Sequence, residues 1–172
     1  MNELKDLLLA PPPLSLAVAE SLTCGALQLT IGRISGASQF FRGGITAYSL
    51  EQKVRHLGVD RAAAAATNSV SAAVAEQMAR GACALFGTDL GVGTTGYAEA
   101  DPAAGIAEPF AWWGLARRLP GGAFEVRSGR VDASGASRAG AQDAAAAAAF
   151  AALLAWVRAL RARSSARTPS AG

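Results

Sequence analysis

The sequence predicts a single α/β domain with three layers (α/β/α), in which a mixed β-sheet lies between two layers of helices. Helical and strand patterns alternate through the first half of the 172 residues, two strands joined by a turn follow, and a long apolar helix comes last. The length suits one core. We expect the domain to span residues 1–163 and a disordered basic tail to occupy residues 164–172.

The first half of the chain contains the alternating elements. Their expected bounds are a helix at 3–10, a strand at 14–19, a helix from residue 25, a strand at 45–48, helices at 50–57 and 70–86, and a strand at 89–94. Pro11 ends the first helix because its ring clashes with the preceding turn. Gly58 supplies a left-handed residue that closes a helix, and Ser71 is a candidate N-cap.

The second half begins with a loop expected at 95–109, which contains two prolines and three acidic residues. Loops of this length inside compact domains are usually functional, so we expect it to cover the site. Strands at 110–117 and 124–131 then flank a glycine-containing turn. A last helix begins near Ser137. Its apolar residues recur with helical spacing at Phe150, Leu153, Leu154, Val157 and Leu160.

Composition and charge limit the possible partners. Hydrophobic residues make up 51% of the chain, but the apolar stretches are alanine-rich, interrupted by glycine, or shorter than the ~20 residues of a membrane span. The N-terminus lacks the layout of a secretory signal, so we expect a cytoplasmic protein without membrane contact. The net charge of +3 comes from arginines near the C-terminus, which argues against nucleic acid as a partner.

The strand at 110–117 carries two adjacent tryptophans, Trp112 and Trp113, which point to opposite faces of the sheet. One is expected in the core, and the other at the site or at an oligomer interface. Together with the apolar surplus, this pair predicts a homo-oligomer, specifically a dimer.

The sequence predicts no metal and no cofactor. Cys24 and Cys83 lie in different segments without CxxC spacing, and His56 is the single histidine. A G-x-G-x-x-G pattern at 91–96 runs into a proline-bearing loop instead of a helix, so we do not interpret it as a dinucleotide site.

Ser21 lies where a buried strand turns sharply into a helix. Such a turn exposes a serine at the carboxyl edge of the sheet, and nearby helix N–H groups can stabilise an anion. Thr23 fits this design as an orienting hydrogen-bond partner, and Gly25 as a place where a ligand approaches the backbone. The alternative is that Ser21 or Thr23 only caps the helix.

Lys53 is the candidate base for Ser21. The chain has two lysines against fourteen arginines, and a buried lysine, unlike arginine, can lose its proton. Tyr48 is spaced so that a strand end and the first turn of a helix direct both side chains to one point. A solvated lysine on a helix surface is the alternative.

Two other nucleophilic or basic side chains, Cys24 and His56, lie near Ser21 and Lys53 in the sequence. Cys24 precedes a helix N-terminus, where a thiolate is favoured, but a small apolar packing residue is the simpler interpretation. His56 follows Lys53 by one turn and is interpreted as a residue of the helix C-terminus.

Four segments carry motifs in the order and spacing of a known family: AESLTCG at 19–25, GASQFFRGGITAYSLEQKVRHLGV at 36–59, VSAAVAEQMARGA at 70–82, and VGTTG at 92–96. Over most of its length the chain thereby resembles the CinA C-terminal domain family, the nicotinamide-nucleotide amidases. Ser21 is similar to the serine of the AES-x-T-G-G turn. Lys53 is similar to the lysine of the Y-S-x-x-x-K motif, which Tyr48 opens.

The resemblance implies a serine amidohydrolase that converts nicotinamide mononucleotide to nicotinate mononucleotide and ammonia without a metal. Ser21 would be the nucleophile and Lys53 its base. The implied partner is a small-molecule carboxamide or nucleotide substrate. The residues that the resemblance places around this substrate are Gly43, Gly44, Thr95, Gly96 and Arg138.

The sequence departs from the family pattern at three places. Cys24 replaces the second glycine of the turn, an acidic segment at 97–102 replaces a glycine-proline loop, and Gln142 occupies the position of one of two arginines, of which Arg138 remains. The acidic side chains Glu99 and Asp101 repel a phosphate. These changes predict altered specificity, and the alternative class is a protein that binds a small ligand without turning it over.

Overall fold

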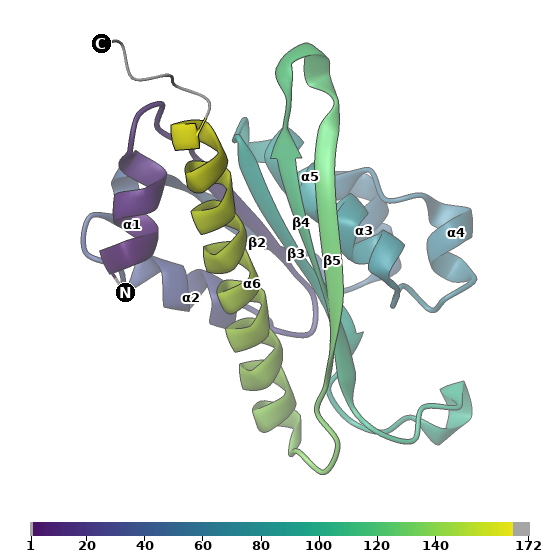
Figure 1. Cartoon of the computed structure of the whole chain (residues 1–172). Coiled ribbons are helices and arrows are strands. Elements are labelled where there is room, and N and C mark those ends of the chain that lie inside the picture. The colour runs from purple at the N-terminus through teal and green to yellow at the C-terminus, as the bar shows by residue number, and fades with distance from the viewer. Residues whose placement is uncertain (1, 167–172) are drawn as a thin grey trace, which may run out of the picture.

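The computed structural model describes residues 2–166 and has three layers (Figure 1). The tail expected to be disordered from residue 164 is helical up to Ala166, where α6 ends, and its remaining residues, 167–172, lie outside the described residues. In chain order, with η for 3-10 helices, the elements are α1 (Asn2–Leu9), β1 (Leu16–Glu20), α2 (Ala26–Gly32), η1 (Ala37–Gln39), β2 (Phe41–Thr46), α3 (Leu50–Leu57), α4 (Arg61–Ala65), α5 (Ala72–Phe86), β3 (Leu90–Tyr97), η2 (Pro102–Ala104), β4 (Phe110–Arg118), η3 (Pro120–Gly122), β5 (Phe124–Asp132) and α6 (Arg138–Ala166).

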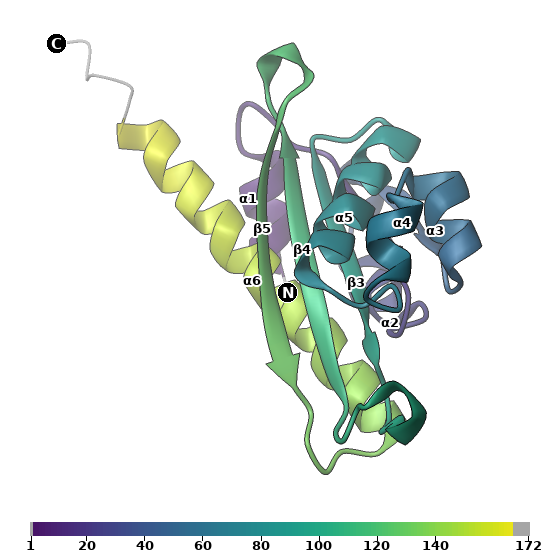
Figure 2. The ribbon, with the colours of Figure 1, turned by 90° about the vertical axis from the view of Figure 1, so that its right-hand side faces the viewer.

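The sheet is mixed, as predicted, with the strand order β2-β1-β3-β4-β5. β1 pairs in parallel with both β2 and β3, whereas β3, β4 and β5 form an antiparallel meander. Helices α1, α2 and α6 cover one face, and α3, α4 and α5 cover the other (Figures 1 and 2). In the register of the sheet Glu20, the last residue of β1, lies beside Thr46 and Thr94. The segments that leave β1 and β2 therefore start from one edge.

Most predicted elements have the predicted type, and the differences have local causes. The helix expected at 70–86 begins at Ala72, because Ser71 is its N-cap and accepts a hydrogen bond from Val74 N–H at 3.2 Å. The short helix α4, which was not predicted, is capped by Asp60 in the same way. β2 begins at Phe41 rather than at residue 45.

The loop expected at 95–109 is shorter than predicted, because β3 continues to Tyr97 in pairing with β4. The remaining residues contain the η2 turn and a bridge between Asp101 and Ile106. Figure 1 shows this segment at the same end of the molecule as the beginning of α6.

Helix α6 packs one face on the sheet and crosses it at an angle (Figure 2). Between Arg138 and Arg163 it is long and apolar enough by length and composition to cross a membrane, and 39% of the tested stretch is buried in the domain. Its buried residues recur every three or four positions, as in a core helix. They are Ala141, Ala145, Ala146, Ala149, Leu153, Trp156, Val157 and Leu160.

On the opposite face, α5 lies directly on a glycine surface of the sheet. A Cβ atom added at Gly91 would lie 2.1 Å from the carbonyl oxygen of Ala79, and one at Gly93 would lie 2.3 Å from that of Ala75. On β4, a Cβ at Gly114 would also lie 2.4 Å from Ala75. The first two glycines of the G-x-G-x-x-G pattern are thus explained by helix packing, since a side chain at either would displace the α5 backbone, whereas a Cβ at Gly96 would meet Phe110 of β4 at 2.4 Å.

The two tryptophans lie on opposite faces of β4, as predicted. Trp113 packs against the core on the α6 side and is covered by the backbone at Gly129. Trp112 is half-buried and does not line the cavity described below. The expected dimer stays a prediction.

Candidate active site

A cavity of about 320 Å³ lies at the carboxyl end of β1 and β3. It is lined by the turn after β1, the segments before α3 and α5, the end of β3 with the loop that follows, and the first residue of α6. Its volume lies within the range of small-ligand sites. Of the residues predicted for the site, it brings together Ser21, Tyr48, Lys53, Thr95, Gly96 and Arg138.

The turn after β1 places Ser21 at the bottom of this cavity. Ser21 is 6% exposed, and its backbone N–H donates to the carbonyl oxygen of Thr94 at 3.0 Å. The Ser21 carbonyl accepts from Cys24 N–H at 3.2 Å, which closes the turn. Among the described residues, Ser21 Oγ has no hydrogen-bond partner and is free to meet a ligand.

Glu20, which was not predicted as a site residue, organises this turn from beneath. Its carboxylate is fully buried and accepts from the N–H groups of Gly25 at 3.0 Å, Leu27 at 3.1 Å and Gln28 at 2.8 Å. The carboxylate therefore neutralises the positive end of α2. The sequence signal for this role is an acidic residue at the end of an apolar strand.

This arrangement changes which backbone groups can stabilise an anion. Gly25 donates to Glu20, Cys24 to Ser21, and Ala26 to the Thr23 carbonyl at 3.0 Å. Within the described turn, the N–H groups of Leu22 and Thr23 have no protein acceptor. They take the place of the donors expected farther along the turn.

Lys53 is buried in the same cavity, so the alternative of a solvated helix-surface lysine is wrong. Its side chain comes from α3 and the residue is 3% exposed. Nζ donates to Thr95 Oγ1 at 3.5 Å, and Thr95 Oγ1 donates to the carbonyl oxygen of Ser69 at 2.7 Å. Burial lowers the pKa of Lys53 to about 8. Residues 3–163 supply no carboxylate within ion-pair distance of it.

A direct hydrogen bond between Lys53 Nζ and Ser21 Oγ is not among those formed by residues 3–163. The Lys53 amine contacts Thr95 instead, at the wall of the cavity that both residues share with Ser21. From the proposed roles of the two residues, Ser21 Oγ and Lys53 Nζ are expected within hydrogen-bond reach or one water apart, and the bridging water stays a prediction.

The segment before α5, which lines the cavity next to Thr95, has an unusual backbone conformation. Asn68 and Ser69 have φ values of 47° and 62°, the left-handed region that non-glycine residues rarely adopt. Ser69 offers its carbonyl to Thr95, and Asn68 Nδ2 donates to Tyr97 Oη at 2.9 Å. No sequence pattern pointed to these two residues.

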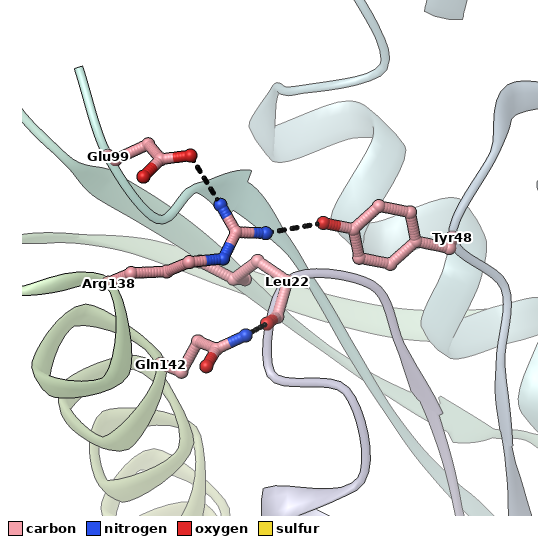
Figure 3. Close-up of polar contacts among 5 residues, drawn as sticks. All are labelled: Leu22, Tyr48, Glu99, Arg138 and Gln142. Atoms are coloured by element: carbon pink, nitrogen blue, oxygen red, sulfur yellow. Dashed lines mark hydrogen bonds and ion pairs between the residues drawn. The ribbon is translucent and has the colours of Figure 1, made fainter. Parts of the chain in front are cut away.

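The mouth of the cavity is crossed by hydrogen bonds from Arg138 (Figure 3). Its Nη1 donates to Glu99 at 2.7 Å and its Nη2 donates to Tyr48 Oη at 2.9 Å. One helical turn farther along α6, Gln142 Nε2 donates to the carbonyl oxygen of Leu22 at 2.8 Å. Three segments of the site, the loop after β3, the segment before α3 and the turn after β1, are thus attached to the start of α6.

Four of the predicted residues do not line the cavity. The Thr23 hydroxyl shares a hydrogen bond of 2.7 Å with Thr94 Oγ1 and joins the turn to β3, and Gly25 contacts Glu20. A Cβ atom at Gly43 would lie 3.0 Å from the Phe86 ring, and one at Gly44 would lie 2.6 Å from Gln28 and Val18. These two glycines are explained by close packing around β2.

The two rival groups also lie outside the cavity lining. Cys24 is exposed with a φ of 48°, so its interpretation as a packing residue is wrong. That positive φ gives a physical reason for a glycine at this position in similar sequences. His56 is exposed near the C-terminus of α3 and contacts Gln52 at 2.9 Å.

The fold and the cavity define an α/β domain with a serine and a buried lysine at the carboxyl end of parallel strands. The chain belongs to the CinA C-terminal domain family, whose sequence model matches residues 2–157. It is similar to a CinA-like protein of Chlorobaculum tepidum, with 41% identity over 126 residues that cover 72% of this chain and 29% of that protein.

Other relatives agree with this assignment. A competence-damage inducible protein of Lacticaseibacillus casei is 38% identical over 72% of this chain and 32% of its own. Among solved structures, a CinA superfamily protein from Enterobacter cloacae has a TM-score of 0.80 at 25% identity, covering 91% of this chain and 89% of that one. The chain spans about a third or less of the length of the curated relatives it matches.

Burial of Lys53 predicts a pH-dependent stability. Because its pKa is about 8 when folded and 10.5 when exposed, the cost of burying the charge is complete below pH 8 and disappears as the pH rises to 10.5. We expect Lys53→Met to be more stable than the wild type at pH 7, and its advantage to shrink between pH 8 and 10.5. Thermal unfolding across this range checks it, with Lys5→Met as the control for losing one lysine. A constant advantage would contradict the prediction.

Proposed function

We propose that this protein is a cytoplasmic amidohydrolase in which Ser21 is the nucleophile and Lys53 the base, acting on a small carboxamide. The observation that carries the proposal is a lysine that is 3% exposed, has no carboxylate partner among the described residues, and shares a cavity with the serine of a strand-to-helix turn. Strongly shifted pKa values of buried groups in a cavity are typical of catalytic sites.

The proposed reaction has two chemical steps. Neutral Lys53 takes the proton of Ser21, and Oγ attacks the carboxamide carbon to form a tetrahedral intermediate. Protonated Lys53 then gives its proton to the leaving nitrogen, so that ammonia departs and an acyl-serine remains. Water, deprotonated by Lys53, attacks the acyl group and releases the carboxylic acid and the serine.

The hydrogen bonds around Lys53 support its role as the base. The Thr95 hydroxyl proton is directed to the Ser69 carbonyl, so Thr95 can only accept from the amine. A neutral Lys53 then keeps its lone pair for another proton donor in the cavity. The free N–H groups of Leu22 and Thr23 are suitable donors for the oxyanion of the intermediate.

Nicotinamide mononucleotide is the substrate that the family resemblance implies. The second candidate function is binding of a small ligand without turnover. What favours it is that Lys53 contacts Thr95 and not Ser21 in this structure. The two functions differ in whether ammonia is released.

Ammonia release across a panel of carboxamides, including nicotinamide mononucleotide, tests the proposal. We expect Ser21→Ala to abolish release and Lys53→Met to lower kcat by about 10²–10⁴-fold, the usual contribution of a general base. Ser134→Ala and Lys5→Met change the same residue types outside the cavity and are expected to keep full activity. Full activity of both cavity variants on a substrate that the wild type hydrolyses would contradict the mechanism. Binding without ammonia from any amide would favour the second candidate.

A further inference from the structure

The charge at the mouth of the cavity bears on the choice of substrate. Arg138 is the arginine that faces the cavity, and its guanidinium already donates to Glu99 and to Tyr48. The ion pair of 2.7 Å joins the start of α6 to the loop after β3 (Figure 3). An anionic ligand that approached this guanidinium would compete with Glu99 for it.

The other charged groups that line the cavity are Asp101 and Lys53. Asp101 lies in the same loop as Glu99, so the cavity lining contains two carboxylates, one arginine, and the largely buried amine of Lys53. Gln142, one turn after Arg138, donates to Leu22 and adds no positive charge. A phosphate near this mouth meets two carboxylates and a guanidinium that already pairs with one of them.

We propose that Glu99 sets the substrate class of the site, so that it accepts an uncharged or cationic carboxamide that lacks a phosphate group. The inference rests on the proposed function for the carboxamide, but its charge preference concerns binding alone. A positively charged ring beside Glu99 and Asp101 is favoured by the same field that disfavours a phosphate.

Two compounds that share one carboxamide test this preference. Nicotinamide mononucleotide carries a phosphate, whereas nicotinamide riboside has the same cationic ring and no phosphate. Their binding is measured by calorimetry with full-length Ser21→Ala protein, in which hydrolysis cannot obscure the affinities. We expect the riboside to bind at least ~10-fold more tightly than the mononucleotide, which corresponds to about 1.4 kcal/mol.

Glu99→Gln in the same background should free Arg138 and reverse the order of the two affinities. The control is Asp132→Asn, because Asp132 also pairs with an arginine at 2.7 Å and its side chain is 66% exposed against 65% for Glu99, but it lies outside the cavity. We expect Asp132→Asn to leave the ratio of affinities unchanged.

Three results would overturn the inference. The first is tighter binding of the mononucleotide than of the riboside to Ser21→Ala protein that keeps Glu99. The second is a change of the affinity ratio in Asp132→Asn as large as that in Glu99→Gln, and the third is no binding of either compound. Ammonia release by the wild type from some other carboxamide would leave the proposed function standing in each case. Loss of the charge preference and loss of the amidase proposal are therefore distinguishable.

A second inference comes from the contact between Gln142 and Leu22. The Leu22 carbonyl and the Thr23 N–H belong to one planar trans peptide group, in which they point in opposite directions. By donating to the carbonyl at 2.8 Å, Gln142 fixes the direction of the Thr23 N–H, one of the two free donors of the turn. We infer that Gln142 is a positioning residue for the Thr23 N–H, which follows the cavity-lining residues Ser21 and Leu22 in the turn.

A serine-directed fluorophosphonate probe tests this role without a carboxamide substrate. Gln142→Glu keeps the size of the side chain but removes its donor at neutral pH, and we expect the rate of Ser21 labelling to fall at least ~10-fold. Gln142→Lys restores a donor and should recover most of the rate, which a merely structural role would not explain. Equal labelling of the wild type and Gln142→Glu would overturn the inference. A wild type that is not labelled at Ser21 would overturn the proposed function, and the role of Gln142 with it.

Discussion

The site depends on the contact between α5 and the glycine surface of β3. Because Gly91 and Gly93 have no side chains, the α5 backbone lies directly on the strand. The same helix has Gly81 against the backbone of Leu57, which brings α3 equally close. Because α3 packs closely on α5, and α5 on β3, the Lys53 side chain on α3 reaches the end of β3, where it contacts Thr95. Side chains at these glycines would move α3 outward and expose the amine.

Burial of Lys53 beside a hydroxyl is the electrostatic consequence. A carboxylate partner would stabilise the ammonium and raise its pKa, whereas Thr95 stabilises it less, so desolvation dominates and the pKa falls to about 8. Glu20 plays the opposite part, since its carboxylate is satisfied by three backbone N–H groups and organises the turn that presents Ser21. The Glu20 carboxylate thus has three backbone donors, whereas the Lys53 amine has one hydrogen-bond partner, Thr95.

Much of this could be predicted from the sequence, because the signals were local. Strand and helix periodicity gave the layers, and the strand-to-helix turn with a rare lysine led to Ser21 and Lys53. The errors concern glycines and contacts between distant segments. Gly43 and Gly44 were expected at a ligand but pack near Phe86 and Gln28, and a sequence does not distinguish these two uses of glycine. The contacts of Arg138 with Glu99 and of Gln142 with Leu22 span 39 and 120 residues, and no periodicity predicts them.

The ease with which Lys53 loses its proton near neutral pH can be measured directly. The chain has two lysines, so ¹⁵N-labelled lysine gives two amine signals, and Lys5→Arg assigns them. An NMR titration is predicted to show Lys53 losing its proton with a pKa near 8. A pKa at or above 10.5, the value of an exposed lysine, would contradict the account.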